Sequence, residues 1–414
     1  MRKYVLIYFL LGSLAMAKDT NLDELLNFVS ETSYRKEQYK IKKDLNKERE
    51  KIYKLDEYNG VETSGETNYD EYDKSYNVSG RVKFGDFYVE GERKKREDGN
   101  FKYGIEKSLK DLILSKNDND FEKLQIEKKI EKKEFNKELE EQQLKLIELY
   151  KNYKDVELEK VIRENALKTL YKEKIILEKS YKLGAISKVD LDSLIYSYLN
   201  INLEVKDLKR ELETLNSEFL YEFKINLNGL VLSKIDTKNI DYKKYLESVG
   251  ENQLKIDKLQ KSLIVKNIDY LTYDKKVPEI SIGAERDTKY NDNRVFLKVS
   301  KNIFYKDMGL EVERANLKDK EIEISQKTRE VLSERFKIKK NLYTLKKDYE
   351  IIKNNRELEE SKYNIKKLEN KMGKIGYIDV MESFDKYLDL KIQEKKLENS
   401  LNSYIYEIKV RGEK

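Results

Sequence analysis

The residues that could do chemistry in this sequence are almost all carboxylates and lysines. The 414-residue chain contains no cysteine and no histidine. Thiolate chemistry is therefore excluded, and both the usual general base and the commonest metal ligand are missing. We find no nucleophile paired with a base and no set of metal ligands in the sequence. We expect a protein that is not an enzyme and that needs no cofactor.

One short motif occurs twice, far apart in the chain. It is KLGAISKVDLDSL at Lys182–Leu194 and KMGKIGYIDVMES at Lys371–Ser383. Each copy interrupts a long polar-apolar periodic segment. Gly184 and Gly373 are suited to end a helix, because glycine tolerates a positive φ. We interpret each copy as a tight reversal between two antiparallel helices.

Both motifs contain acidic residues where the second helix of the reversal would begin. Ser187, three residues before Asp190, is typical of a capping box, and Gly376 takes the same place before Asp379. Asp379 and Glu382 lie three residues apart, so on a helix they share one face. Carboxylates in the first turn stabilise the helix dipole, which is one explanation for this pair.

Two long segments without glycine or proline predict the helices that these reversals connect. They run between Ile105 and Leu183 and between Leu310 and Met372. At about 1.5 Å per residue, some 65 helical residues would span roughly 100 Å. The second segment has an apolar seam of seven-residue period with one shift of six, typical of a supercoiled helix. The seam residues are Leu310, Leu317, Ile324, Val331, Ile338, Leu345 and Ile352, then Leu358, Ile365 and Met372.

A β-hairpin is predicted before each long helix, at about 76–109 and about 279–304. The segments alternate apolar and polar residues around turn-forming residues, as a strand with one apolar face does. A further alternating run at 78–84 is either a strand extension through a bulge or an extra hairpin. The residues expected on the apolar face are Phe87, Val89, Phe101, Tyr103, Ile105, Ile280, Ile282, Val295, Leu297 and Val299.

The order of these elements predicts a duplicated, mainly α fold with a small β part. Residues 1–17 carry two basic residues, a short apolar run and an Ala-Met-Ala site, which is typical of a signal peptide. Residues 18–226 form the first repeat, with a helix, the hairpin, a long helix at about 117–182, a tip at 183–188 and a return helix. Residues 227–239 are the linker. Residues 240–414 repeat the order, with a long helix at about 308–372 and a tip at 373–377.

Two hairpins give about four strands per chain, which is too few to close a barrel of about eight strands or more. Left open, the strands would expose their edges and an apolar face. Three copies would pool twelve strands, and the apolar-out, polar-in alternation suits a transmembrane barrel. The alternative is a soluble two-hairpin domain packed on helices.

On these features the sequence resembles the TolC-like outer-membrane efflux proteins, the outer membrane factor family, over nearly all of the mature chain. The resemblance implies a homotrimer with a twelve-stranded β-barrel in the outer membrane, continuing into a periplasmic α-helical barrel. It also implies a passive exit duct for small molecules or proteins, as part of a tripartite efflux or type I secretion system. Its partners would be outer-membrane lipid, a periplasmic adaptor protein and an inner-membrane pump.

The resemblance also assigns roles to the two motifs. The adaptor-facing tips would be Leu183, Gly184 and Ala185 in the first repeat and Met372, Gly373 and Lys374 in the second. Asp379 and Glu382 would form the acidic ring of the periplasmic gate. Lysines flank both tips, which departs from the acidic surroundings expected of a simple cation-selective opening.

The composition also bears on three other classes of protein. Nucleic-acid binding is disfavoured because 85 Lys and Arg nearly balance 79 Asp and Glu, with alternating signs typical of solvated helix faces. A secreted coiled-coil structural protein without a membrane barrel remains an alternative. So does a periplasmic adaptor, although adaptors have one helical hairpin and Gly-rich β modules that this sequence lacks.

Overall fold

The computed structural model describes residues 18–55, 58, 60–72, 74–94, 98–227, 230–301 and 308–413. The predicted signal peptide, residues 1–17, lies outside the described residues. The chain forms two compact units. The tip unit comprises residues up to Lys36, Lys137–Glu251 and residues from Glu330 onward, and the sheet unit comprises Glu37–Asn136 and Asn252–Arg329.

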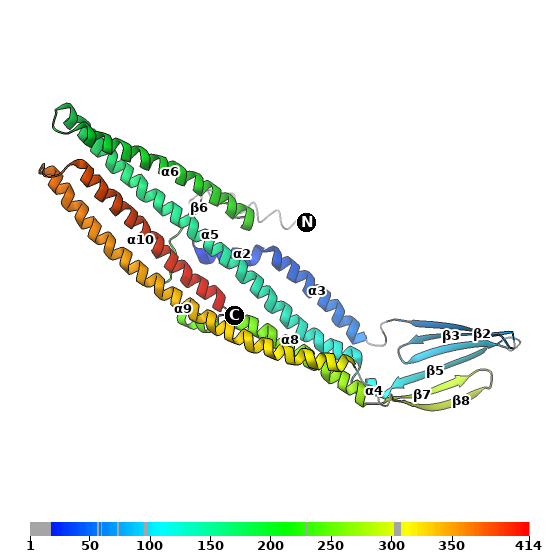
Figure 1. Cartoon of the computed structure of the whole chain (residues 1–414). Helices are drawn as coiled ribbons and strands as arrows, with labels where there is room; N and C mark the ends of the chain where they lie inside the picture. The colour runs from blue at the N-terminus through cyan, green and yellow to red at the C-terminus, as the bar shows by residue number, and fades with distance from the viewer. Residues whose placement is uncertain are drawn as a thin grey trace. The chain divides into compact units, whose positions relative to one another are not determined.

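Long helices make up most of the described chain (Figure 1). The helices predicted at about 117–182 and 308–372 are observed as α5 and α9. No described helix is both long enough and apolar enough to cross a membrane. The helices are α2 (Leu22–Thr32), α3 (Tyr34–Leu55), α4 (Leu109–Ile113), α5 (Lys116–Lys182), α6 (Lys188–Phe223), α7 (Tyr242–Ser248), α8 (Glu251–Lys276), α9 (Met308–Lys371) and α10 (Tyr377–Gly412).

The single helix expected before the first hairpin is broken at Ser33 into α2 and α3. The Ser33 hydroxyl accepts a hydrogen bond from the Arg35 amide at 3.1 Å and donates one to Gln142 Oε1 at 2.5 Å. A serine side chain that binds nearby backbone in this way competes with helical hydrogen bonding. The break is therefore produced by a local polar contact that apolar periodicity does not reveal.

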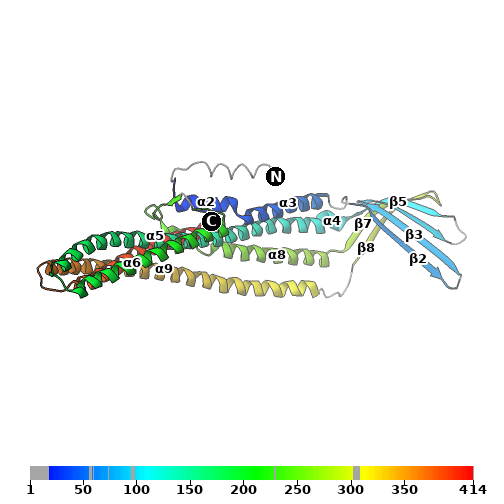
Figure 2. The same ribbon diagram turned by 90° about the horizontal axis from the view of Figure 1, so that it is seen from above.

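The sheet unit contains an open, fully antiparallel sheet of six strands in the order β2-β3-β4-β5-β7-β8 (Figures 1 and 2). The expected count of four strands is therefore wrong, and the expected total of twelve for three copies rested on it. The strands are β2 (Glu62–Asp70), β3 (Ser75–Phe84), β4 (Phe87–Lys94), β5 (Asn100–Ser108), β7 (Glu279–Asp287) and β8 (Asp292–Ser300).

Two local features explain the extra strands. The run at 78–84 is a separate strand, β3, because Phe84 and Phe87 pair directly across a two-residue turn. Gly85 in that turn has φ +56, which glycine adopts without steric cost. Strand β2 was not expected, because its sequence ETSGETNYD has no apolar alternation. Its place in the sheet comes from pairing with β3 over nine residues.

The ten predicted apolar residues all lie on one face of this sheet, which we call the apolar face. Directly opposed residues in antiparallel strands point to the same side, and the observed pairs connect the ten residues across four strands. These pairs include Phe87 with Ile105, Val89 with Tyr103, Ile282 with Leu297 and Ile280 with Val299. Most of these side chains are exposed, up to 81% for Val295.

The opposite face, which we call the polar face, carries a network of charged and polar side chains. Glu106 accepts hydrogen bonds from Arg81, Ser281 and Lys298, each at 3.0 Å. These four residues lie on β5, β3, β7 and β8, so the network crosses the sheet. The sheet therefore separates an exposed side that is mainly apolar, where Arg93, Lys107 and Arg286 also lie, from a side dominated by charged and polar residues.

The tip unit has its own apolar core between α5, α6 and α10. The fully buried side chains there include Leu170, Leu194 and Val380. A second core cluster, around Tyr150 and Phe219, lies against a small parallel sheet of β1 (Lys18–Thr20) and β6 (Leu230–Leu232). The predicted linker, 227–239, therefore contains a paired strand, and its residues 228 and 229 lie outside the described chain.

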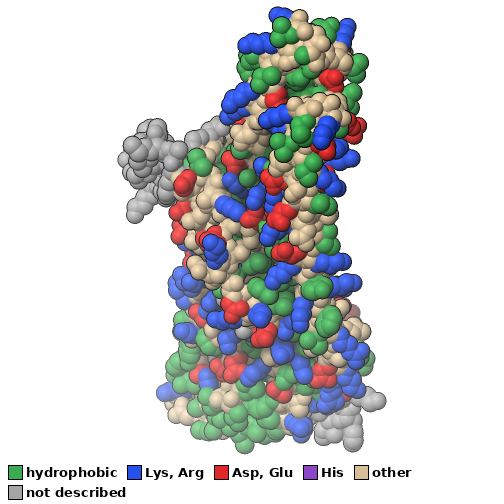
Figure 3. All heavy atoms as spheres, turned by 90° about the vertical axis from the view of Figure 1, so that its left-hand side faces the viewer, with side chains coloured by type: hydrophobic (Ala, Val, Ile, Leu, Met, Phe, Trp, Pro, Cys, Tyr) green, Lys and Arg blue, Asp and Glu red, His purple; other side chains and the backbone are tan. Residues whose placement is uncertain are grey.

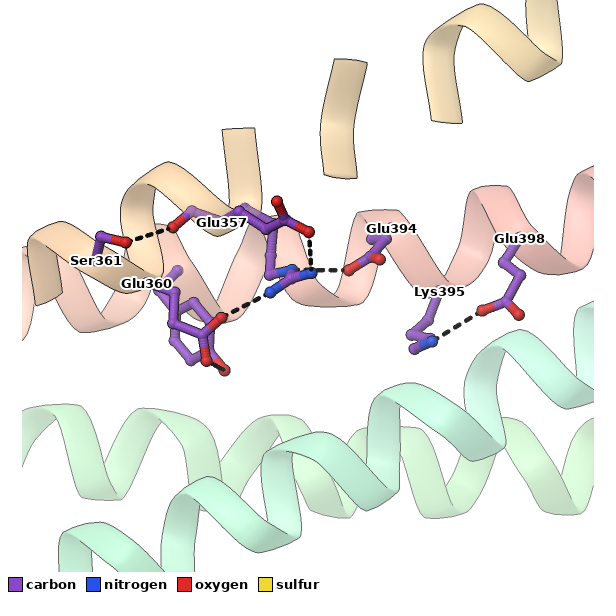
Figure 4. Close-up of polar contacts among 8 residues, drawn as sticks. Glu357, Glu360, Ser361, Glu394, Lys395 and Glu398 are labelled. Carbon is purple, nitrogen blue, oxygen red and sulfur yellow. Dashed lines mark hydrogen bonds and ion pairs between the residues drawn. The ribbon is translucent and has the colours of Figure 1, made fainter. Parts of the chain in front are cut away.

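The predicted seam of α9 follows its buried side only in part. Val331 and Ile338 are each 6% exposed, whereas Leu358 and Ile365, after the shift of period, are 54% and 55% exposed. Between the two sets, Arg356 of α9 contacts Glu394 of α10 at 2.9 Å and Glu360 at 2.6 Å (Figure 4). An ionic contact thus replaces the apolar seam where its period shifts.

Over the exposed helix surfaces, basic and acidic side chains are interspersed (Figure 3). Several belong to ion pairs one helical turn apart, such as Lys47 with Asp44 and Arg210 with Asp207. Such exposed pairs add little stability, because water and salt screen the attraction between their charges. On the face that Figure 3 shows, the charges are mixed in sign and form no basic patch.

Candidate gate at the helical tips

The two motifs form two helix reversals with the same backbone geometry. Gly184 after α5 has φ +69, and Gly373 after α9 has φ +71. Each glycine amide donates a hydrogen bond to the carbonyl three residues earlier, Gly184 to Tyr181 and Gly373 to Asn370, both at 2.9 Å. A Cβ atom at either glycine would meet no atom within 4 Å, so the positive φ and not a lack of space calls for glycine.

The predicted tip residues are all exposed. Leu183 and Met372 present 84% and 60% of their surface, and Gly184, Ala185, Gly373 and Lys374 are exposed with them. Exposing a large apolar side chain to water is unfavourable, so Leu183 and Met372 are available to contact a partner surface. Their role toward an adaptor remains a prediction.

The return helix of the first repeat, α6, is capped within its own motif. The Ser187 hydroxyl accepts the Asp190 amide at 3.1 Å, which satisfies one of the free amides of the first turn. The same hydroxyl donates to Asp190 Oδ2 at 2.5 Å. The cap therefore forms where the sequence placed it.

The return helix of the second repeat, α10, begins at Gly376, which has no side chain to cap it. Asp190 of the first tip supplies the acceptor, because its Oδ1 atom accepts the Tyr377 amide at 2.9 Å. One carboxylate therefore binds the capping hydroxyl of α6 and the first amide of α10. Sequence analysis did not find this role, and its only signal was glycine at an N-cap position.

A second contact joins α5, α9 and α10 just inside the tips. The Tyr377 hydroxyl donates to Glu173, and Lys367 donates to the other oxygen of the same carboxylate at 2.6 Å. Burial, followed by the hydrogen bond and charge of Glu173, raises the pKa of Tyr377. The phenol therefore stays protonated and keeps donating throughout the physiological pH range.

The predicted gate residues lie on the side of α10 that points away from the core. Asp379 and Glu382 are exposed, whereas Val380, Met381 and Phe384 between and after them are buried in the core cluster. In the described part of the chain, neither carboxylate forms an ion pair. Lys366 donates to the Asp379 carbonyl at 3.2 Å, so a basic residue lies near the pair.

The tips carry two carboxylates on an exposed helix face. Among the described residues, no group of three or more His, Cys, Asp or Glu side chains could hold a metal ion. The tips instead combine two glycine reversals, a shared cap and two exposed carboxylates on one helix face.

Comparison with known proteins finds similarity in structure and none in sequence. No protein-family model matches the chain. No curated protein sequence matches it.

Solved outer-membrane channels match nearly the whole chain. CusC, whose structures follow folding and transmembrane channel formation, is 11% identical with a TM-score of 0.65, over 95% of this chain and 92% of its own. The outer membrane protein VceC of Vibrio cholerae is 10% identical with a TM-score of 0.63, over 94% and 95%. The CmeC outer membrane channel of Campylobacter jejuni is 11% identical with a TM-score of 0.61, over 95% and 86%. The chain therefore has the TolC-like outer membrane factor fold.

Proposed function

We propose that this protein is an outer-membrane channel, with the sheet unit in the membrane and the helices in the periplasm. It acts as the passive exit duct of a tripartite efflux or type I secretion system. The fold supports a transport role, since the proteins that share it are channels and not enzymes.

The observation that carries this proposal is the separation of the two sheet faces. Ten apolar residues on four strands form one exposed face, and the other face holds the Glu106 network. In water, an apolar face of this extent would be covered by a core or a partner. Lipid covers such a face in an outer-membrane strand, whose other face is polar and lines a lumen.

The sheet needs further copies of the chain to lose its edges, which supports the trimer. Helix α9 gives independent support, because it carries an exposed apolar stripe in addition to its buried seam. This stripe has the roughly seven-residue spacing of an interface between helices. Its members are Phe336, Tyr343, Ile351, Leu358 and Ile365, each 44–77% exposed.

At the tips, we propose that Leu183 and Met372 lie against the periplasmic adaptor. The same trimer would repeat Asp379 and Glu382 three times around its axis. Carboxylates crowded into a narrow opening attract cations and resist anions. The Asp190 and Glu173 contacts would hold the return helices together when the gate is closed.

The experiment that tests the function is outer-membrane fractionation, native mass in detergent and single-channel recording in planar bilayers. Val82→Arg places a charge on the apolar face, and Ser79→Arg places the same charge on the polar face of the same strand. The cost of an arginine facing lipid rises from about 0–1 kcal/mol near the membrane interfaces to about 2–4 kcal/mol at mid-membrane. We expect Val82→Arg to lose membrane insertion and Ser79→Arg to keep it.

Two results would contradict the proposal. One is a parent protein that fractionates as a soluble monomer. The other is equal insertion of Val82→Arg and Ser79→Arg, which would show that the apolar face does not meet lipid.

A further inference from the structure

The two outer strands of the six-stranded sheet are long, regular and open on one side. Within the described chain, β2 pairs only with β3, and β8 pairs only with β7. Each has nine residues, and neither contains proline. Soluble proteins usually protect such edges, because an exposed flat edge pairs with another strand.

The directions of the two edges make them complementary. All five pairings in the sheet are antiparallel, so β2 and β8, at the two ends of six strands, run in opposite directions. Strand β8 of one chain can therefore join β2 of the next as another antiparallel pair. With an odd number of strands, the same contact would have been parallel.

The faces of the two edges also match. On β2 the three carboxylates, Glu62, Glu66 and Asp70, lie on the polar face, and the apolar face carries only Thr63, Gly65, Thr67 and Tyr69. On β8 the basic residues Arg294 and Lys298 lie on the polar face, opposite to Val295 and Leu297. Joining the edges therefore extends both faces without placing a charge on the apolar one.

The stagger of the sheet, together with full overlap of the two edges, gives the register. Following directly opposed residues from Glu62 on β2 across the sheet leads to Arg294 on β8. Strand β8 ends at Ser300, six residues further along the chain. A sheet that closes into a barrel needs such a stagger. One residue of stagger per strand is the ratio of an eight-stranded barrel of shear 8, whose strands tilt by about 36°. Transmembrane strands tilt by about 35–45°.

When the contact between β8 of one chain and β2 of the next keeps this stagger, all nine residues of β2 lie opposite the nine residues of β8. Glu62 then lies opposite Ser300, and Ser64 lies opposite Lys298. Lys298 falls diagonally between Glu62 and Glu66, within reach of a long side chain. Arg294 falls between Glu66 and Asp70 in the same way. Lys298 already contacts Glu106 at 3.0 Å, and Arg294 contacts Asp292 at 3.2 Å. The carboxylates of β2 would add a second partner to each.

We propose that β8 of each chain pairs with β2 of the next, so that three copies close a barrel of eighteen strands. The inference rests on the proposed membrane channel. It adds how the barrel wall closes and how many strands the wall contains. Barrel diameter grows about linearly with strand number, so eighteen strands enclose roughly twice the cross-section of twelve. Each chain contributes β2 to one contact and β8 to another, and the wall is incomplete without the neighbouring chains.

Cysteine cross-linking of the full chain in outer membranes tests this contact, and the absence of native cysteine gives a clean background. Two double variants place cysteines in neighbouring pairs of the register, Thr63→Cys with Val299→Cys and Ser64→Cys with Lys298→Cys. Neighbouring antiparallel pairs alternate in hydrogen bonding, so one of the two is the closer kind. Oxidation should give covalent dimers and trimers with at least one pair.

Two controls use the same strands. Thr63→Cys with Val82→Cys joins direct partners of β2 and β3 and should cross-link only within a chain. Thr63→Cys with Lys298→Cys places the thiols on opposite faces and should give no cross-linked oligomer. Density for the unmodified protein, which needs no substitution, should show eighteen strands.

Any other outcome contradicts either the contact between chains or the proposed channel itself. Outer-membrane trimers that cross-link at 63–82 but at neither inter-chain pair overturn the inference and leave the proposed function standing. Twelve strands in the density do the same. A parent protein that forms no outer-membrane trimer overturns both.

Discussion

The two helical tips have the same backbone and different supports. Gly184 and Gly373 have nearly equal φ values, and the same hydrogen bonds close both turns. The first return helix then carries its own cap, Ser187, while the second begins at Gly376 and takes its cap from Asp190. Duplication has thus kept the turn and changed its stabilisation, so the second tip depends on the first.

This dependence suits a gate. A helix that caps itself keeps its first turn whatever its neighbour does, whereas α10 loses an amide partner as soon as the tips separate. The predicted gate residues Asp379 and Glu382 lie on the dependent helix. Opening is therefore expected to begin at α10 and not at α6.

The largest effect is expected from replacing the glycine that each tip has at the same position of its turn. Gly184→Val and Gly373→Val each force a β-branched residue into positive φ, which should cost about 2 kcal/mol. Thermal unfolding followed by circular dichroism should show equal losses for the two variants, because neither position lacks space. Gly→Asn at either position should cost less, since asparagine tolerates this conformation. Unequal valine losses would show that the turns differ beyond their caps.

A smaller effect should separate the tips. Asp190→Ala removes the acceptor for Tyr377 and the partner of Ser187, and we expect a loss of about 1–2 kcal/mol. Ser187→Ala removes only the cap of α6 and should cost about 1 kcal/mol. Hydrogen exchange at the Tyr377 amide should accelerate in Asp190→Ala and stay unchanged in Ser187→Ala. Equal acceleration in both variants would remove the dependence of α10 on the first tip.

The sequence predicted the features of the tips that are local. A glycine after a long apolar-periodic segment needs only its own backbone to end a helix, and Ser187 needs only the next turn. The contact from Asp190 to Tyr377 joins residues far apart in the chain, and a carboxylate in a capping box gives no sign of a second partner.

The same limit explains the sheet. Alternation placed all ten apolar residues on one face, because a strand with one apolar side has a period of two. Strand β2 has threonine, glycine and tyrosine where the other strands have aliphatic residues. Its membership is decided by pairing with β3, so the number of strands could not be predicted from alternation.

The contact of Tyr377 with Glu173 should have a smaller effect than the caps. Tyr377→Phe keeps the buried ring and removes one hydrogen bond, so we expect a loss of about 1 kcal/mol. Because the pKa of Tyr377 is raised, its stabilisation is complete below the ordinary tyrosine pKa. The difference in unfolding free energy between wild type and Tyr377→Phe should therefore be constant from pH 6 to pH 9. A difference that disappears within this range would contradict the assigned donor.

The smallest effect on stability and the most specific effect on function are expected at Asp379 and Glu382. Both side chains are exposed, so replacing both with alanine should cost no more than about 1 kcal/mol, the value of first-turn carboxylates on a helix dipole. In a closed trimer the change would remove six carboxylates from the opening. We therefore expect weaker block by trivalent cations in planar bilayers.

The matched control for this pair is Glu211→Ala with Glu218→Ala, which removes two exposed carboxylates from α6, the helix that caps itself. It changes the net charge equally but leaves the opening intact, so cation block should equal that of wild type. Lys374 and Lys366 near the gate would offset part of the acidic charge, so the change should be smaller than for a tip without lysines. Unchanged block in the Asp379 and Glu382 variant, with normal conductance, would leave these carboxylates as helix-dipole partners only. The gate would then have to be sought in the contacts that hold α10 to the first tip.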